Sequence, residues 1–113
     1  MLSRFGSENG AMNTADRQTV HLQVKLFGHL KQTGQMPNLA LDIFAGSTVS
    51  AVLWELVRIL GEDFRRAIFD GAGNLHGGIE VVLNEEHLPA RKITVLTVQQ
   101  DGNLYLVPMI EGG

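Results

Sequence analysis

The sequence contains no cysteine among its 113 residues. This absence excludes disulfide bonds, a cysteine nucleophile, thiolate metal ligands and a persulfide carried on this chain. A small secreted domain held together by disulfides is also excluded, and the N-terminus lacks the apolar segment of a signal peptide. Together these observations favour a cytoplasmic location.

Long apolar runs and clusters of basic residues are also missing. No run approaches the about 20 apolar residues that a membrane-spanning helix needs, so we expect no membrane partner. The nine Lys and Arg residues are outnumbered by twelve Asp and Glu, and only Arg65-Arg66 and Arg91-Lys92 are adjacent. Because phosphate contacts need clustered basic side chains, we expect no nucleic-acid partner. The length and the 44% hydrophobic content are those of one domain with its own core.

Familiar catalytic motifs are absent too. The chain has no GxSxG, no HExxH and no GxxxxGK[ST] pattern. The four histidines show no metal-ligand spacing; they are His21, His29, His76 and His87. Adjacent carboxylates such as Glu85 and Glu86 point to opposite faces of an extended chain and do not converge on one substrate. We therefore expect no catalytic residue, no bound metal and no bound cofactor.

The first half of the chain predicts a hairpin followed by a helix. Apolar and polar residues alternate from Thr19 to Phe27, which indicates a strand with one buried face. A second alternation over 39–43 follows a turn-like stretch at 31–35, which predicts an antiparallel pair. Apolar residues then recur at helical spacing over 49–60 and would cover the sheet. Gly61 is well placed to end this helix.

Shorter elements are predicted around that helix. Ser47 or Thr48 can cap its N-terminus, and a further helical turn is expected from Asp63 to Phe69. Ile79 to Leu83 alternates as a third strand. Pro89 disfavours a central strand, so we expect only a short edge strand within 93–97.

The last strand decides the expected architecture. Leu104 to Val107 is a dense apolar run, which predicts a strand buried on both faces. The element order predicts an α+β sheet with the helix on one face. First and last strands that lie side by side at the centre must run parallel. We expect a disordered leader at 1–18, a domain at 19–108 and a flexible tail at 109–113.

The chain ends in Gly112-Gly113, shortly after the last predicted strand. Glycine has no Cβ and adopts any backbone conformation, so two terminal glycines can enter a narrow site in extended form. A terminal carboxylate becomes a good electrophile only when it is activated, for example as an acyl-adenylate. This ending favours a tail that another enzyme threads into its active site. The alternative interpretation is an ordinary frayed terminus.

Several segments, in order, resemble a known family. They are Val24 to Gly28, Gly46 to Val49, Ile79 to Asn84, and the most specific one, Pro108 followed by Gly112-Gly113 at the chain end. On these segments residues 20 to 113 resemble the MoaD/ThiS-like sulfur-carrier family. That family includes the small subunit of molybdopterin synthase, the thiamine-pathway sulfur carrier and the ubiquitin-related modifiers.

The resemblance implies a β-grasp, ubiquitin-like fold with a mixed sheet and one main helix packed on one face. It implies that an ATP-dependent activating enzyme adenylates Gly113, which is then converted to a thiocarboxylate. Ile110, Glu111 and Gly112 would thread the tail into that enzyme. The chain would be a carrier or co-substrate without turnover of its own, and ATP would be used by the activating enzyme. The implied acceptor is the molybdopterin synthase large subunit or an equivalent protein.

A partner must also bind the folded domain. Phe27, Tyr105, Val107 and Met109 are the candidates for an apolar partner surface on the sheet. Alternatively the N-terminal leader, or the segment 89–97, covers these side chains.

Other functions of the same fold stay open at this point. A thiamine-pathway sulfur carrier shares the activation step and differs in its acceptor. A ubiquitin-like modifier would be joined through Gly113 to lysines of target proteins. A non-catalytic assembly protein, similar to some phage tail-assembly proteins, would make no chemical use of the terminal glycines.

Overall fold

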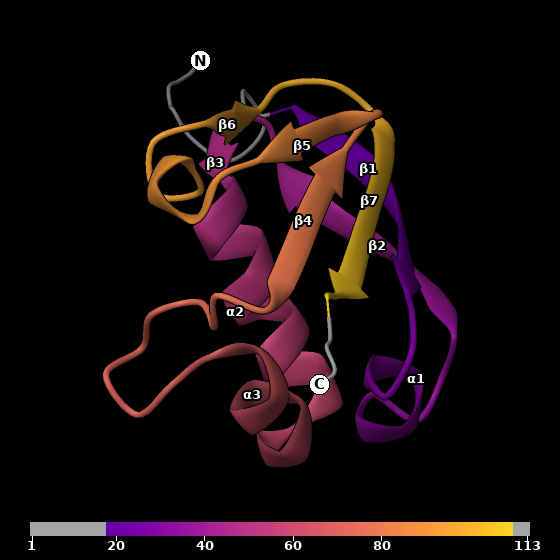
Figure 1. Cartoon of the computed structure of the whole chain (residues 1–113). Coiled ribbons are helices and arrows are strands. Elements are labelled where there is room, and N and C mark those ends of the chain that lie inside the picture. The colour runs from indigo at the N-terminus through magenta and orange to yellow at the C-terminus, as the bar shows by residue number, and fades with distance from the viewer. Residues whose placement is uncertain (1–17, 110–113) are drawn as a thin grey trace, which may run out of the picture.

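The computed structural model describes residues 18–109 (Figure 1). The expected leader and tail lie outside the described residues, apart from Gln18 and Met109. Within the described range the elements are β1 (Thr19–Leu26), α1 (Leu30–Thr33), β2 (Asn38–Phe44), β3 (Ser47–Thr48), α2 (Val49–Leu60), α3 (Glu62–Ile68), β4 (Ile79–Leu83), β5 (Glu86–Leu88), the 3-10 helix η2 (Ala90–Lys92), β6 (Thr97–Val98) and β7 (Gly102–Pro108).

The central sheet has five strands in the order β2-β1-β7-β4-β5. β1 and β7 pair in parallel at its centre, and the other neighbours are antiparallel. A parallel pair needs a crossover connection, and α2 lies in that connection against one face of the sheet (Figure 1). This topology confirms the predicted α+β arrangement, with the first and last strands parallel at the centre.

The hydrophobic core lies between the sheet and its helices. Four side chains of α2 are at most 1% exposed: Val49, Val52, Leu53 and Leu56. They pack over the inward side chains of the central strands, among them Leu22, Val24, Leu104 and Leu106. Each fully buried aliphatic side chain contributes about 1.5–3 kcal/mol through removal from water. The core therefore depends on one side of each central strand.

Both ends of α2 form as the sequence predicts. Thr48 is the N-terminal cap, and its Oγ1 accepts a hydrogen bond from the backbone N–H of Ala51 at 3.1 Å. Gly61 ends the helix with a φ of 102°, which favours glycine. The caps place α2 so that its apolar side meets the sheet.

The stretch 31–35, predicted as a turn, includes part of a short helix. Residues Leu30–Thr33 form α1, in which the Leu30 side chain is fully buried. Gly34 follows, and a Cβ at that position would lie 2.7 Å from Cδ1 of Leu26. The prediction was wrong because burial of one leucine and close packing at one glycine stabilise a helical turn with no periodic pattern.

The predicted edge strand within 93–97 is also displaced. The strand next to β4 is β5, while β6 pairs with β3 in a separate two-stranded sheet. Asn84 and Glu85 have φ values of 51° and 73°, so a tight turn brings β5 back onto β4. Ile93 is buried in the core instead of lying in an edge strand. The turn, not the hydrophobic pattern, positions this edge.

The last strand differs from its prediction in burial. Leu104 and Leu106 are fully buried, but Tyr105 and Val107 on the other face are half-buried. The expectation of burial on both faces was therefore wrong. Both faces of β7 carry apolar side chains, but the helices cover only the face with Leu104 and Leu106.

Candidate functional site

The chain leaves the domain at the end of β7, at a point we call the tail root (Pro108 and Met109). The Met109 N–H donates to the carbonyl oxygen of Gly78 at 2.5 Å, and Pro108 pairs with Ile79 of β4. Gly28 has a φ of +58°, and a Cβ there would lie 2.8 Å from Cγ of Pro108. Glycine at this position therefore lets Pro108 pack against the loop after β1. The tail-threading residues Ile110, Glu111 and Gly112, and Gly113 itself, lie outside the described residues.

The face of the sheet opposite α2 carries an apolar patch, which we call the open-face patch (Phe27, Val82, Tyr105 and Val107). Tyr105 pairs with Val82 of β4. The Phe27 and Tyr105 rings meet edge to face, with centroids 6.0 Å apart. Val82 is only 8% exposed but does not belong to the core cluster, so its open-face neighbours cover it. Two strands, β4 and β7, and the loop after β1 therefore build one surface.

The predicted partner surface is thus partly assembled. Phe27 is 40% exposed and contacts Tyr105, while Val107 is half-buried two residues further along β7. Met109 is 58% exposed and lies at the tail root, beyond the strand. Sequence reasoning missed Val82, whose position opposite Tyr105 depends on strand pairing and leaves no local signal.

One alternative for this surface is contradicted. The segment 89–97 was a candidate cover, but it packs at the start of α2. The N–H of Val49 donates to Leu96 O at 3.0 Å and that of Ser50 to Ile93 O at 2.8 Å. The segment therefore lies against the helix end of the molecule and leaves the open-face patch uncovered. The other candidate cover, the N-terminal leader, lies outside the described residues.

Charged side chains share the open face of the sheet with this patch. Lys25 pairs with Tyr105 and Glu80 pairs with Val107, whereas the His21–Asp42 pair lies further along β1 and β2. On β1 and β2, His21 Nδ1 lies 2.6 Å from Asp42 Oδ1, and this hydrogen bond, with the negative charge of Asp42, raises the pKa of His21. On β4 and β5, His87 Nδ1 contacts the Glu80 carboxylate. An apolar centre with a polar border is the usual composition of a protein–protein interface.

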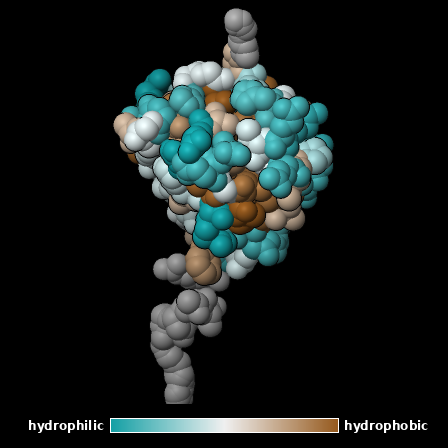
Figure 2. Space-filling model, turned by 90° about the horizontal axis from the view of Figure 1, so that it is seen from below, coloured by the Kyte–Doolittle hydropathy of each residue, from teal (hydrophilic) through white to brown (hydrophobic). Residues whose placement is uncertain are grey.

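The end of the molecule below the patch is hollowed where the chain leaves the domain. Figure 2 views this end and shows an apolar area within mostly polar surface. A groove of about 310 Å³ lies here, lined by His29, Ala67, His76, Gly78, Ile79, Pro108 and Met109. The tail root forms part of the wall of this groove.

Among residues 18–109 no group of three or more His, Asp or Glu side chains is placed to hold a metal ion. None of the helices in this part of the chain is long and apolar enough to cross a membrane.

Comparison with known proteins supports this view of the fold. No family model matches the chain, and no curated protein matches it significantly. SAMP1, the small archaeal modifier protein 1 of Haloferax volcanii, is 24% identical with a TM-score of 0.72, over 82% of this chain and 99% of that one.

Two other solved structures are similar. Urm1 of Trypanosoma brucei is 16% identical with a TM-score of 0.67, over 84% of this chain and 97% of that one. A putative molybdopterin converting factor subunit 1 from Pyrococcus furiosus is 15% identical with a TM-score of 0.63, over 80% and 99%. These likenesses confirm the predicted ubiquitin-like β-grasp fold.

Proposed function

We propose that this protein is a ubiquitin-like sulfur carrier that acts through the carboxylate of Gly113. One observation carries the proposal: in a β-grasp fold, the central strand β7 ends at the surface five residues before the terminal glycine. The Met109–Gly78 hydrogen bond and the packing of Pro108 against Gly28 fix the tail root on the domain. The chain therefore leaves the domain at a defined point. The shared fold with a molybdopterin converting factor subunit supports the same function.

The proposed chemistry takes place in a partner's active site. An activating enzyme joins the Gly113 carboxylate to the α-phosphate of ATP and releases pyrophosphate. The terminal sulfur of a persulfide on another protein attacks the acyl-adenylate carbonyl, and AMP leaves. A thiol then attacks the donor cysteine's sulfur in the acyl disulfide and breaks the S–S bond. This releases the thiocarboxylate on Gly113 and leaves a disulfide between that thiol and the donor cysteine. The carrier itself, which has no cysteine, supplies only the acyl group.

The domain would contribute recognition. The open-face patch and Met109 would contact the activating enzyme, while Ile110, Glu111 and Gly112 would enter its active site. The same surface would then contact the acceptor, which we propose is a molybdopterin synthase large subunit in the cytoplasm. The thiamine-pathway alternative shares the activation steps and differs only in that acceptor. ATP binds the activating enzyme, and the carrier needs no cofactor of its own.

Intact-protein mass spectrometry tests the proposal directly. The full chain is incubated with ATP, a sulfur source and the activating enzyme from the same cell. We expect a mass gain equal to the replacement of one oxygen by sulfur, and no gain in a variant that lacks Gly113. A variant with one alanine added after Gly113 is the matched control for tail length and should also show no gain.

Two outcomes would contradict the sulfur-carrier proposal. One is no gain with an activating enzyme that is active on a known carrier. The other is a normal gain in the variant with the added alanine, because a carrier must end in the activated glycine. Tolerance of added residues would instead favour an assembly protein of the same fold.

A second candidate function is a protein modifier, because one neighbour of similar structure is named a small archaeal modifier protein. Here a lysine amine of a target attacks the acyl-adenylate, an amide bond forms and AMP leaves. An N-terminally tagged chain should then give higher-mass conjugates in cells, and deletion of Gly113 should remove them. Conjugates without mass gain in the previous experiment would select the modifier over the carrier.

A further inference from the structure

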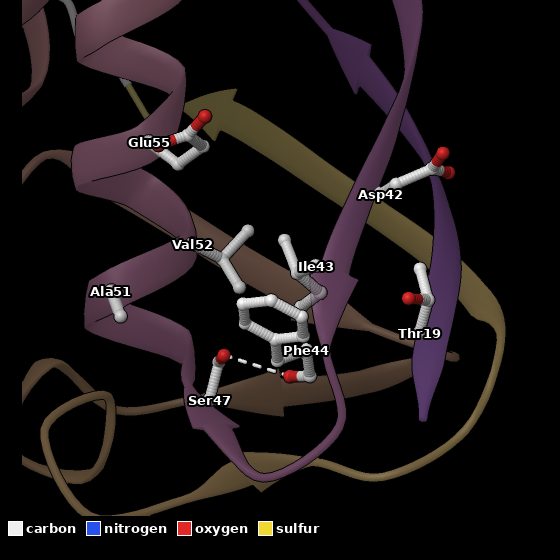
Figure 3. Close-up of a pocket in the computed structure, with 8 residues that line it drawn as sticks. All are labelled: Thr19, Asp42, Ile43, Phe44, Ser47, Ala51, Val52 and Glu55. Carbon is white, nitrogen blue, oxygen red and sulfur yellow. Dashed lines mark hydrogen bonds between the residues drawn. The ribbon is translucent and has the colours of Figure 1, made fainter. Parts of the chain in front are cut away.

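A groove of about 530 Å³ lies between β2 and α2 (Figure 3). Its lining residues are Thr19, Asp42, Ile43, Phe44, Ser47, Ala51, Val52 and Glu55. Figure 3 shows the Ile43, Phe44 and Val52 side chains directed toward one another at its centre. The groove is therefore apolar inside. Ser47 and Glu55 lie on its helix side, whereas the Asp42 side chain is directed away from α2.

One side of this groove is an open sheet edge. β2 is the first strand of the five-stranded sheet, and no other strand of residues 18–109 pairs with its outer side. The Ala45 N–H donates to Gln18 O, and the Leu26 N–H donates to Pro37 O, both at 2.8 Å. In an antiparallel ladder, alternate residues bond to the partner strand. The backbone groups of Ala40 and Asp42 consequently point away from β1.

The two edges of the sheet are unequal. β2 has seven residues, whereas β5 at the opposite edge has three. An exposed edge of that length offers a row of backbone donors and acceptors to an added strand. The β2 edge also runs beside an apolar groove that could take the side chains of such a strand.

The charged residues of the groove indicate what kind of peptide could bind there. Asp42 and Glu55 are its only charged lining residues, and no Lys or Arg lines it. Each carboxylate has one neighbouring base outside the lining, His21 for Asp42 and Arg58 for Glu55. Carboxylates accept charge-assisted hydrogen bonds from Lys and Arg, so a basic side chain complements this rim.

We propose that the β2 edge and this groove bind an extended peptide segment of another protein as an added strand. The segment would exchange backbone hydrogen bonds with Ala40 and Asp42. Alternate apolar side chains would enter the groove, and a Lys or Arg would lie beside Asp42 or Glu55. This proposal does not depend on sulfur transfer, because none of these residues belongs to the tail root.

The position of the site allows it to act alongside the tail. Thr19 begins β1, whereas the tail root follows the end of β7, which is parallel to β1. The groove and the tail root therefore lie at opposite ends of the sheet (Figure 1). A protein bound at the groove could hold the carrier while another enzyme engages the tail.

The test uses the full chain and a displayed library of random peptides about nine residues long, enough for one strand and its flanks. Selected peptides are synthesised and titrated by fluorescence anisotropy and by backbone amide chemical shifts. We expect alternating apolar residues with at least one Lys or Arg, and shifts at Ala40, Asp42 and Ala51. Failure to select a binder, or shifts confined to Phe27 and Met109, would overturn the proposal.

Two variants test separately how the β2 edge and the groove contribute to peptide binding. Ala40→Pro removes an N–H that faces away from β1, so the β1–β2 bonds are kept. Ala51→Arg fills the groove from an exposed helix position, and Ile59→Arg is its control on the same helix outside the groove. We expect at least about tenfold weaker peptide binding for the first two and no change for the control. Equal affinities in all three would overturn the proposal.

Two further measurements complete the test. Amide spectra of each variant show whether it is folded, and Ala51→Arg alone carries the test if Ala40→Pro is not. Sedimentation of the unmodified chain measures self-association. A dimer that Ala40→Pro abolishes would assign this edge to a second copy of the chain and overturn the proposal of a peptide partner.

Discussion

The two faces of the central sheet carry apolar side chains from the same strands but differ in what covers them. On the helix side, Leu104 and Leu106 are fully buried under α2 and its neighbours. On the other side, Tyr105 and Val107 are half-buried and continue into the exposed Phe27. The covered face supplies stability, whereas the open-face patch keeps part of its apolar area exposed among the described residues. An apolar strand can therefore serve two purposes at alternate positions.

The largest expected difference between the faces is in stability. Leu106→Ala should lower the free energy of unfolding by about 2–5 kcal/mol, because it leaves a cavity in the core. Val107→Ala, its neighbour on the open face, should cost about 1 kcal/mol or less. Urea unfolding measures both. Equal losses would mean that the open face is as tightly packed as the core.

The tail root should show the next largest effect. Gly28→Ala forces a non-glycine residue to a φ of +58°, which costs about 1–2 kcal/mol, and places a Cβ against Pro108. Thermal unfolding of Gly28→Ala, Pro108→Ala and the double variant measures the contact. The loss from Gly28→Ala should be smaller when Pro108 is already alanine. An equal loss of stability in both backgrounds would mean that contact with Pro108 does not contribute to the effect of Gly28→Ala.

A smaller effect is expected within the open-face patch. The edge-to-face contact of Phe27 with Tyr105 should give a coupling energy of about 0.5–1.5 kcal/mol in a double-mutant cycle of alanine variants. Denaturant unfolding of the four proteins supplies the values. A coupling energy near zero would show that the Phe27 and Tyr105 rings do not stabilise each other.

The smallest effect concerns pH on the open face. Asp42 raises the pKa of His21, so this pair stabilises the fold below the ordinary histidine pKa of about 6.5. That contribution is lost as the pH rises through the raised pKa of His21. Asp42→Asn should lower the His21 pKa in an NMR titration, whereas Glu80→Gln should not. A His21 pKa insensitive to Asp42→Asn would contradict the pairing.

Local pattern predicted the elements with clear periodicity. The alternation from Thr19 to Phe27 and the helical spacing over 49–60 correspond to β1 and α2. β5 and α1 were missed for different reasons. β5 depends on the turn at Asn84 and Glu85, and α1 depends on burial of Leu30 beneath distant residues. Neither leaves a periodic signal, because β5 depends on the conformation of a turn and α1 on the burial of a single leucine.

The candidate site was predictable in part. Phe27 and Tyr105 were expected on one surface, and the structure brings their rings into contact. Val82 and the packing of Pro108 against Gly28 were not expected, since each joins segments far apart in the chain. The groove beside β2 likewise requires α2 to be placed next to a sheet edge.

The sequence by itself determined the order of the main strands and helix, the side of each strand that is most apolar, and the glycine ending. Period and glycine content are local properties, so they can be read without a fold. Only the tertiary structure decided which apolar side chains stay exposed and which sheet edge stays open. Exposure depends on what packs on a residue, and for the open-face patch that is set by strands and a loop distant in sequence.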